Sequence, residues 1–283
     1  MTLPLTTTLS SGLTARVEED RWVPGAVQLV IDGTPQSHVN LGDNTDLFFE
    51  YIRRIGHVID LCRPPGSPIS ALHLGGGAFT LPRYIEATRP GSRQQVIELE
   101  GDLVDLVREA APLPRQASIR VRRGDARDVL GRLPAGMHGA MDLVVVDIFA
   151  GAQTPAHVSS REFYELIAPL LSADGVVVVN AADGAGMRFV RGQAATLDAL
   201  FPAVAAIGEP QVLKGRRFGN VILVAGASGA AWEWLPRLLA SGPHPARQLV
   251  GDEFADFIRG ASPVTDATAV DSPLPARSLF DKG

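Results

Sequence analysis

The residues best suited to chemistry lie where predicted strands end, and the first group of them is rich in glycine. LHLGGG (72–77) closes an apolar run with Gly75, Gly76 and Gly77. A glycine-rich turn after a strand lets the backbone approach a nucleoside closely at the carboxyl edge of a sheet. The alternative is a tight turn from strand to helix that binds nothing. The pattern is not the dinucleotide fingerprint, because Thr80 stands in place of its third glycine.

Two carboxylates follow at positions that suit the ribose and the base of such a nucleoside. Glu98 ends the next predicted strand, roughly 20 residues after the glycines, where an acid can accept hydrogen bonds from ribose hydroxyls. Asp125, in RRGDARD, follows the third strand and can accept from an adenine amino group, while Ala126 leaves room for the ring. The alternatives are a solvated strand end for Glu98 and a helix N-cap for Asp125. Glu100 is expected to be solvated. Together with the glycines, Glu98 and Asp125 favour an adenosine-type site.

A further acid ends the most apolar predicted strand. Asp147 follows four apolar residues in the run LVVVDIF, which should hold its backbone rigidly at the edge of the sheet. A carboxylate at this edge can orient or deprotonate an attacking nucleophile. The alternative is an acid that caps the following loop. We expect Asp147 to be the catalytic residue.

Composition excludes several other classes of function. The net charge of −5 provides no overall basic field for nucleic acid. Cys62 is the only cysteine and the six histidines are scattered, so we expect no metal site. The longest apolar stretches are too short to span a bilayer, and the first residues lack a secretory signal pattern. We therefore expect a cytoplasmic protein with no nucleic-acid partner and no membrane partner.

Alternating strands and helices must position these residues. Short runs rich in Val, Ile and Leu alternate with helical patterns, which predicts a parallel sheet covered on both faces. Two later strands, at 204–208 and 220–224, are joined too closely for a parallel crossover, so they should form an antiparallel hairpin at the sheet edge. The predicted parallel strands are 69–74, 94–99, 118–123, 141–149 and 175–181, and the predicted helices are 80–88, 102–111, 126–132, 160–171 and 186–200.

The organisation of the chain follows from breaks in this pattern. Residues 14–41 have strand character with turn signals between them, and residues 46–61 have helical spacing, before RPPGSP (63–68) interrupts the chain. We expect an α/β fold with a class I S-adenosylmethionine-methyltransferase-like, Rossmann-like sheet, an antiparallel terminal hairpin and a small N-terminal β domain. The expected divisions are 1–65 for the N-terminal β-hairpin domain and its linking helix, 66–260 for the nucleoside-binding domain, and 261–283 for a loosely ordered tail.

Over roughly residues 26–225, these motifs together resemble the spermidine synthases, the polyamine aminopropyltransferase family. The family motifs GGGDGG, EID, GDA and DxxDP correspond here to GGGAFT (75–80), ELE (98–100), GDA (124–126) and DIFA (147–150). The family's DGxxQ is present as DGTPQ, which ends in Gln36, and its YxxxxxH pattern matches Tyr51 and His57.

The resemblance implies a transferase with decarboxylated S-adenosylmethionine as co-substrate, a small-molecule amine as acceptor and no metal. It implies that Gln36 contacts the sulfonium side of the co-substrate, that Asp147 acts on the attacking amine and that Tyr51 lines the polyamine groove. Glu98 would bind the ribose and Asp125 the adenine, whereas His57 is expected to pack in the core. Family members commonly form dimers, so we expect a homodimer, with the N-terminal hairpins as the contact.

The sequence departs from the family where a cationic substrate would be held. Ala78 replaces the Asp of GGGDGG, Ala150 replaces the second Asp of DxxDP, and EPQVLKGRRF (209–218) lacks the family's aromatic residue. The expected function is aminopropyl transfer from decarboxylated S-adenosylmethionine to an amine such as putrescine. The alternatives are an S-adenosylmethionine-dependent methyltransferase and a catalytically degenerate nucleoside-binding homologue. The small residues that follow Ala150 predict a flexible loop that closes over the substrate.

Overall fold

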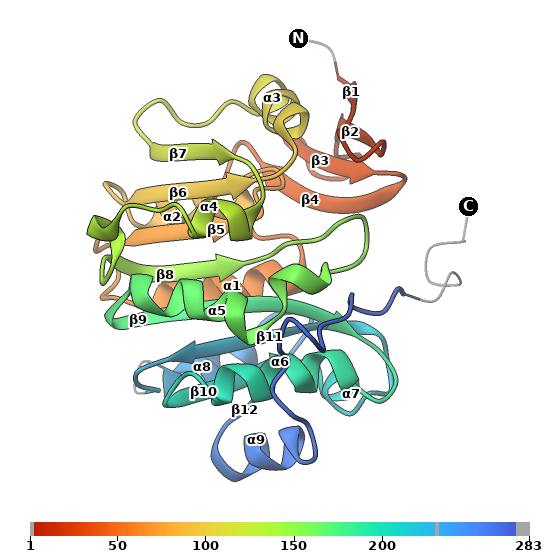
Figure 1. Ribbon diagram of the computed structural model, residues 1–283. Helices are drawn as coiled ribbons and strands as arrows, with labels where there is room; N and C mark the ends of the chain where they lie inside the picture. The colour runs from red at the N-terminus through yellow and green to blue at the C-terminus, as the bar shows by residue number, and fades with distance from the viewer. Residues whose placement is uncertain (1–2, 230–231, 276–283) are drawn as a thin grey trace.

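The computed structural model describes residues 3–229 and 232–275. Its strands form two sheets, which lie side by side in Figure 1. One sheet has four strands in the order β1-β2-β3-β4, and the other has eight in the order β12-β10-β11-β9-β8-β5-β6-β7. This is the α/β fold with a class I methyltransferase-like sheet and a separate N-terminal β domain that the sequence predicts.

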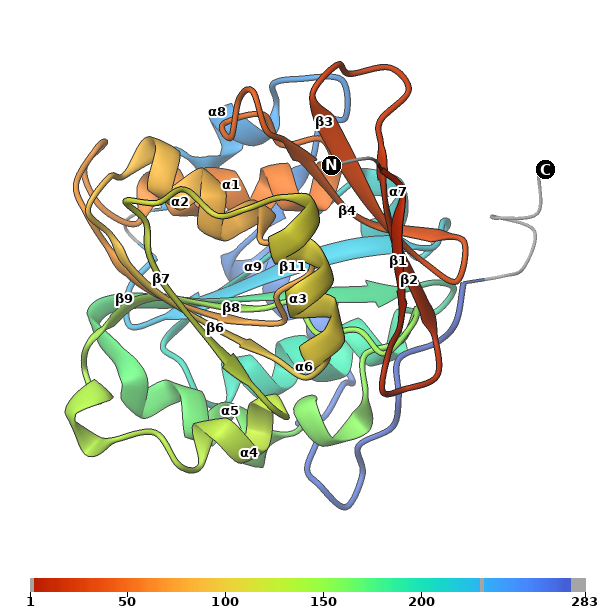
Figure 2. The ribbon, with the colours of Figure 1, turned by 90° about the horizontal axis from the view of Figure 1, so that it is seen from above.

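The smaller sheet is antiparallel throughout. Its strands are β1 (Leu5–Thr8), β2 (Thr14–Glu19), β3 (Ala26–Ile31) and β4 (Thr34–Asn40). Strand β1 was not predicted, because its sequence LTTT carries a single apolar side chain and gives little hydrophobic signal. The buried face of the sheet packs with helix α3 (Gly101–Ala110), so the N-terminal domain is attached to the larger one through an apolar cluster (Figure 2).

The larger sheet carries the site at the carboxyl ends of its parallel strands. These strands are β5 (Ser70–Leu74), β6 (Arg93–Glu98), β7 (Ser118–Arg123), β8 (Met141–Val146) and β9 (Leu171–Asp183). Strands β10 (Ala203–Gly208) and β11 (Gly219–Gly226) form the predicted antiparallel hairpin, with β11 next to β9. The hairpin does not form the sheet edge, because the short strand β12 (Arg247–Leu249) pairs with β10.

Helices cover both faces of this sheet (Figure 2). On one face, α1 (Glu50–Leu61), α2 (Thr80–Thr88) and α8 (Leu235–Leu239) contribute to one apolar cluster. On the other face, a second cluster contains α4 (Ala126–Leu130), α5 (Arg161–Ile167), α6 (Arg188–Asp198), α7 (Pro210–Leu213) and α9 (Gly251–Ile258).

Two predicted helix boundaries are wrong for local reasons. The helix predicted from residue 46 begins at Glu50, because Asp46 closes a turn with Asp43 and accepts a hydrogen bond from Asn40 at 3.1 Å. The helix predicted to run to residue 171 ends at Ile167 and continues as a 3₁₀ turn, Ala168–Leu170. That turn contains Pro169, which has no backbone N–H for an α-helical hydrogen bond.

The connection between the two sheets is fixed by one buried guanidinium. Arg89 is 2% exposed and lies at the C-terminal end of α2. Its Nη1 and Nη2 atoms donate to backbone carbonyls at distances of 2.8–3.0 Å. Because these carbonyls all converge on one side chain, the end of α1 and the segment after it are held in one conformation. The carbonyls belong to Ile59, Asp60, Arg63, Pro64 and Ser67.

The described part of the expected C-terminal tail is tied to the α/β domain by hydrogen bonds. Residues 261–275 contain no helix or strand. The Val264 carbonyl accepts from the Arg161 N–H at 2.7 Å, and Asp266 forms a bidentate ion pair with Arg127. Ser272 is fully buried. The expectation of loose order rested on composition alone, which carries no information on these contacts. Residues 276–283 lie outside the described part.

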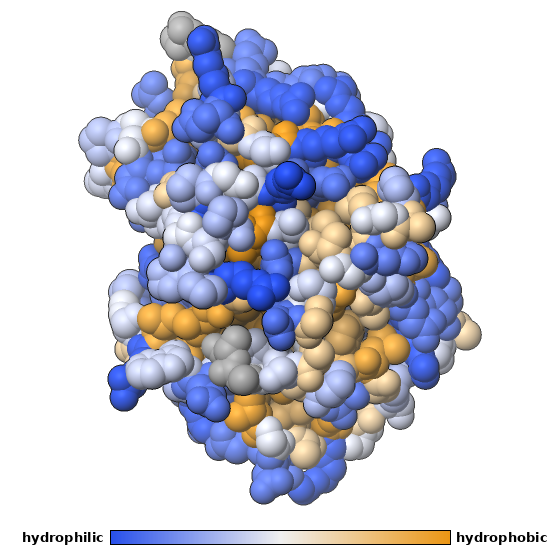
Figure 3. Space-filling model, turned by 90° about the vertical axis from the view of Figure 1, so that its left-hand side faces the viewer, coloured by the Kyte–Doolittle hydropathy of each residue, from blue (hydrophilic) through white to orange (hydrophobic). Residues whose placement is uncertain are grey.

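Figure 3 shows hydrophobic patches divided by hydrophilic residues on one side of the molecule. Among the large hydrophobic side chains of the described residues, Trp22, in the turn between β2 and β3, is the most exposed at 88%. Within the described ranges, 3–229 and 232–275, the structure has no helix of the length and apolarity needed to cross a membrane.

Candidate active site

A cavity lies between the N-terminal sheet and the carboxyl ends of β5, β6, β7 and β8. Strands β3 and β4 contribute Leu29, Ile31 and Ser37 to its wall. The structure brings every residue predicted for the nucleoside and the amine to this single cavity. Those residues are Gln36, Tyr51, Gly75, Gly76, Gly77, Glu98, Asp125, Ala126 and Asp147.

The glycine-rich loop is shaped by two close approaches of its backbone. Gly75 has φ +93°, and a Cβ there would lie 2.0 Å from the carbonyl oxygen of Asp147, so a side chain would push the two strand ends apart. Gly77 has φ +47°, and a Cβ there would lie 2.5 Å from Ser37 Oγ. That hydroxyl also accepts a hydrogen bond from the Ala78 N–H at 3.2 Å. Ser37 was not predicted to belong to the site, because no short motif includes it.

Glu98 is held by the backbone on both of its oxygens. Its Oε2 accepts from the Gly76 N–H at 2.7 Å, and its Oε1 accepts from the Glu100 N–H at 3.0 Å. A carboxylate oxygen has more than one acceptor position, so Glu98 can still receive hydroxyl groups from a ligand. The next residue, Leu99, also lines the cavity and is 58% exposed. A large apolar side chain left open beside this carboxylate offers a surface for a planar base, a role that was not predicted.

The expectation that Glu100 is solvated is wrong. Glu100 is 8% exposed, and its oxygens accept from Ser10 N–H at 2.8 Å, Ser10 Oγ at 2.7 Å and Ser11 N–H at 3.1 Å. Burial acts to raise the pKa of Glu100, but these hydrogen bonds outweigh it and hold the pKa below its ordinary value. The sequence conceals this contact because Ser10 and Glu100 lie far apart in the chain. Glu100 therefore fastens the β1–β2 turn to the rim of the cavity.

Asp125 caps a helix and also lines the cavity. Its Oδ1 accepts from the Asp128 N–H at 3.0 Å and so caps α4, and its Oδ2 lies 2.8 Å from His157 Nε2. Burial acts to raise the pKa of Asp125, but the hydrogen bonds from His157 and the backbone hold it below its ordinary value. His157 comes from the loop that follows β8 and also lines the cavity. Its position could not be predicted, since no motif in the sequence includes it.

Asp147 is a half-buried carboxylate at the end of β8. Burial raises its pKa to about 6, although a hydrogen bond of 2.8 Å from Asn180 Nδ2 opposes that effect. Tyr51, from α1, lies close enough for the two groups to interact. Burial raises the pKa of Tyr51 well above its ordinary value, and the charge of Asp147 adds to the increase. Tyr51 and Asp147 thus define one end of the cavity.

The loop after β8 is hydrogen-bonded to the N-terminal sheet and to the C-terminal segment. Gln36 Nε2 donates to the Gly151 carbonyl at 3.2 Å, and Gln153 Nε2 donates to the Ser272 carbonyl at 2.5 Å. The Thr154 N–H donates to Ser272 Oγ at 2.9 Å, and the Ser272 N–H donates to the Thr154 carbonyl at 3.0 Å. The loop predicted to move is therefore held in this structure by contacts from the N-terminal sheet and from the C-terminal segment.

The cavity has the electrostatic character of a site for a cation. Its lining acids are Glu98, Glu100, Asp125 and Asp147, and none of the described residues that line it is a lysine or an arginine. His73 also lines it, and burial lowers the pKa of His73 to about 4, so the ring is neutral near pH 7. A ligand carboxylate would meet no lysine or arginine in this lining, whereas a sulfonium or an ammonium group would be attracted.

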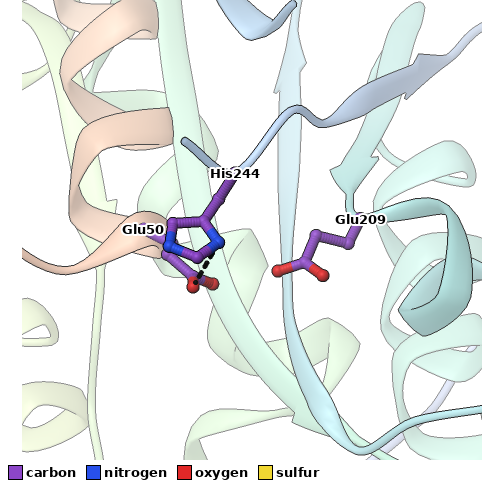
Figure 4. Close-up of side chains that lie close together, drawn as sticks. All are labelled: Glu50, Glu209 and His244. Atoms are coloured by element: carbon purple, nitrogen blue, oxygen red, sulfur yellow. Dashed lines mark ion pairs between the residues drawn. The ribbon is translucent and has the colours of Figure 1, made fainter. Parts of the chain in front are cut away.

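A second cluster of polar side chains lies outside the cavity lining (Figure 4). The ligand atoms of Glu50, Glu209 and His244 lie within 4.8 Å of one another. However, Arg54 Nη2 lies 3.8 Å from Glu50 and 3.4 Å from Glu209, and Arg217 lies 3.0 Å from Glu209. These guanidinium groups balance both carboxylates, so the cluster is an ion-pair network that connects α1 with the ends of β10 and β11.

His57 also lies outside the cavity lining, on α1, where it is half-buried. Burial lowers its pKa below the ordinary value. Because the side chain is only half-buried, the expectation that His57 packs in the core stays a prediction.

Comparison with solved structures reveals a similarity to spermidine synthases. The chain is similar to the crystal structure of a probable spermidine synthase from Corynebacterium glutamicum, with 30% sequence identity, a TM-score of 0.85, and coverage of 94% of this chain and 97% of that one. The spermidine synthase from Thermotoga maritima aligns with 15% identity and a TM-score of 0.57, over 84% of this chain and 77% of that one, which shows the fold alone.

Curated relatives match over shorter stretches. A polyamine aminopropyltransferase of Vibrio vulnificus is 30% identical over 135 residues, which cover 47% of this chain and 44% of the relative. A probable polyamine aminopropyl transferase of Bifidobacterium longum is 32% identical over 120 residues, which cover 41% of this chain and 26% of the relative. The chain thus spans less than half the length of these two relatives. No protein-family model matches it.

Proposed function

Because the chain belongs to the spermidine synthase family, we propose that it transfers an aminopropyl group from decarboxylated S-adenosylmethionine to a primary amine such as putrescine. The observation that carries the proposal is the charge of the cavity, whose described lining includes four acids and no lysine or arginine. Both reactants are cations, and the decarboxylated co-substrate has no carboxylate that would need a basic partner.

The nucleoside end of the cavity is assigned to the groups near β6 and β7. Glu98 would accept the ribose hydroxyls, with the backbone of Gly75, Gly76 and Gly77 close to the sugar. Asp125 would accept from the adenine amino group, Ala126 would leave room for the ring, and Leu99 would contact its face. Gln36 would face the sulfonium side, from the opposite wall.

The reaction would take place at the end defined by Asp147 and Tyr51. The amine nitrogen attacks the methylene carbon beside the sulfonium, the bond from that carbon to sulfur breaks, and its electron pair stays on sulfur in methylthioadenosine. The nitrogen then carries a surplus proton, which Asp147 accepts. A free alkylamine titrates near pH 10, by analogy with the lysine side chain, so a positioned carboxylate assists its attack in the neutral form. Tyr51 would line the path of the amine.

The departures from the family weaken the hold on ammonium groups. Ala78 is 3% exposed and Ala150 lies in the loop after β8, where the family has acids. Each missing charged hydrogen bond costs about 1.5–3 kcal/mol. A neutral residue at position 78 also removes the repulsion that an acid would exert on the carboxylate of intact S-adenosylmethionine. This observation favours methyl transfer as the second candidate, and a nucleoside-binding homologue without turnover as the third.

The test is an assay with each co-substrate and putrescine, with products identified by mass spectrometry. Aminopropyl transfer gives methylthioadenosine and a polyamine longer by one aminopropyl group. Methyl transfer gives S-adenosylhomocysteine from the intact co-substrate. Calorimetric binding of either nucleoside without any product would support the degenerate homologue.

We further propose that the protein is a cytoplasmic homodimer. Trp22 is 88% exposed at the β2–β3 turn, where the N-terminal hairpins are available for contact. The one cysteine, Cys62, is half-buried, and burial raises its pKa to about 11, so it remains a thiol. Light scattering of the intact protein tests the dimer, and Trp22→Ser should shift it toward the monomer.

A further inference from the structure

Asp147 is held by a chain of hydrogen bonds that the family motifs do not include. Asn180, in β9, donates from Nδ2 to Asp147 Oδ1 at 2.8 Å. Asn220, in β11, donates from Nδ2 to Asn180 Oδ1 at 2.9 Å. Because the oxygen of Asn180 already accepts from Asn220, its amide nitrogen is the atom that faces Asp147. The second amide therefore fixes the orientation of the first.

The chain of hydrogen bonds lies across three neighbouring strands of the sheet. Strand β8 pairs with β9, and Val146 is opposite Val179, so Asp147 and Asn180 are the next residues along their strands. Strand β9 pairs in turn with β11, where Asn220 is opposite Ala182. Hydrogen-bonded strands hold their side chains at fixed separations. The positions of Asn180 and Asn220 are therefore set by the sheet. Asp147 directly follows β8, where its N–H donates to the Leu74 carbonyl at 2.8 Å.

A buried amide at this point in β9 destabilises the fold unless its polar atoms form hydrogen bonds. Asn180 follows a run of valines and is 2% exposed. Burying an amide without partners is unfavourable, and here both ends of the side chain are bonded. An apolar residue would continue the strand without needing either partner. The polar side chain therefore serves the group that it contacts, which is Asp147.

We propose that Asn180, oriented by Asn220, is a positioning residue that keeps the Asp147 carboxylate ionised and leaves its second oxygen for the amine. This inference rests on the proposed function. A neutral donor stabilises the carboxylate without cancelling its charge. A lysine or an arginine in its place would cancel that charge. Only Oδ1 is engaged by Asn180, so Oδ2 remains available as the acceptor of a proton.

The other titratable groups near this end of the cavity can be distinguished from Asp147. Tyr51, from α1, stays neutral because burial raises its pKa well above the ordinary value. His73, from β5, has its pKa lowered to about 4 by burial and is neutral above that pH. Glu98, from β6, is bonded to the backbone N–H groups of Gly76 and Glu100. His157, which also lines the cavity, is paired with Asp125 at 2.8 Å. A titration near pH 6 that moves in Asn180→Leu and is lost in Asp147→Asn therefore belongs to Asp147.

The experiment measures this titration with and without the donor. In Asn180→Leu, which removes the donor at similar size, the acid limb of the kcat profile should move up by about one to two pH units, the value of one charged hydrogen bond. Asn220→Ala should shift the limb in the same direction by less, because the Asn180 amide can then rotate. Val178→Ala, a buried packing change on the same strand, should leave the limb in place.

A readout without turnover separates this inference from the proposed function. The side-chain carboxyl of Asp147 can be titrated by carbon NMR in protein labelled at aspartate, with Asp147→Asn to assign the signal. A raised midpoint in Asn180→Leu or in Asn220→Ala supports the positioning role even if no amine is a substrate. An unchanged midpoint in both folded variants overturns it. If Asn180→Leu does not fold, Asn220→Ala alone decides between the two outcomes.

Discussion

Replacing Asp147 by asparagine removes the proposed base while almost preserving its shape. A positioned acid–base group contributes about 10²–10⁴-fold to rate, so kcat should fall by about that factor. The affinity for methylthioadenosine should stay within a few fold, because Glu98 and Asp125 line the other part of the cavity. The asparagine side chain would still lie against Asn180, so a loss of turnover could not be attributed to a change of conformation at the end of β8.

The pH dependence of the wild-type protein follows from the burial of Asp147. Burial raises the pKa of this carboxyl to about 6. Below that pH the group is protonated and cannot accept a proton from the amine, so kcat should decline as the pH falls through about 6. Above it the carboxylate is ionised and the rate should be retained. The acid limb should disappear in Asp147→Asn.

The same shift predicts a gain in stability for the variant. The folded-state pKa of about 6 lies above the ordinary value of 3.8, so ionising Asp147 disfavours the folded state. The penalty is absent below the unfolded pKa, grows as the pH rises toward the folded pKa, and is constant above it. Asp147→Asn should therefore raise the free energy of unfolding by about 1–3 kcal/mol at pH 8 and change it little at pH 4.

The assay is the release of methylthioadenosine between pH 5 and 9, with calorimetric binding and urea unfolding of both proteins. The variant Asp142→Asn is a matched control, since Asp142 lies at the start of β8 and is bonded to Arg63 and to the Ser70 N–H. Asp142→Asn should be less stable than the wild type and should keep the acid limb of the kcat profile. Turnover of Asp147→Asn close to that of the wild type would refute the assignment of the base.

Other predictions concern the nucleoside end, the glycine loop and the C-terminal segment. Glu98→Gln should weaken methylthioadenosine binding by about 1.5–3 kcal/mol in calorimetry, and unchanged affinity in the folded variant would contradict the ribose assignment. Gly75→Ala should lower both the melting temperature and nucleoside affinity, because its Cβ would lie 2.0 Å from the Asp147 carbonyl oxygen; unchanged values of both would contradict the close approach. Ser272→Ala should speed proteolysis within residues 150–161 in the free protein, and methylthioadenosine should slow it; identical cleavage in both proteins, with and without nucleoside, would argue against a held loop.

Much of the fold could be predicted because its signal is local. The parallel strands are runs of valine, isoleucine and leucine, and the short connection between β10 and β11 forced an antiparallel pairing. Strands β1 and β12 were missed because they are short and weakly apolar. Their places are set by pairing with longer strands, which a window of sequence does not contain.

The site was predictable where one motif carries both the residue and its position. Glu98 and Asp147 end strands that are themselves evident, so their arrival at one cavity follows from the parallel order. Glu100 was judged solvated, since its partner Ser10 lies far away in sequence. His157 and Asn180 were overlooked for a similar reason, as each acquires a role only through a contact made by folding.

The most direct test of aminopropyl transfer is a single product analysis. The intact protein is incubated with decarboxylated S-adenosylmethionine and putrescine, and with intact S-adenosylmethionine and putrescine in parallel. Methylthioadenosine and spermidine should form in equal amounts in the first mixture and not in the second, and Asp147→Asn should abolish most of both. Formation of S-adenosylhomocysteine and a methylated amine in the second mixture, with no spermidine in the first, would contradict aminopropyl transfer.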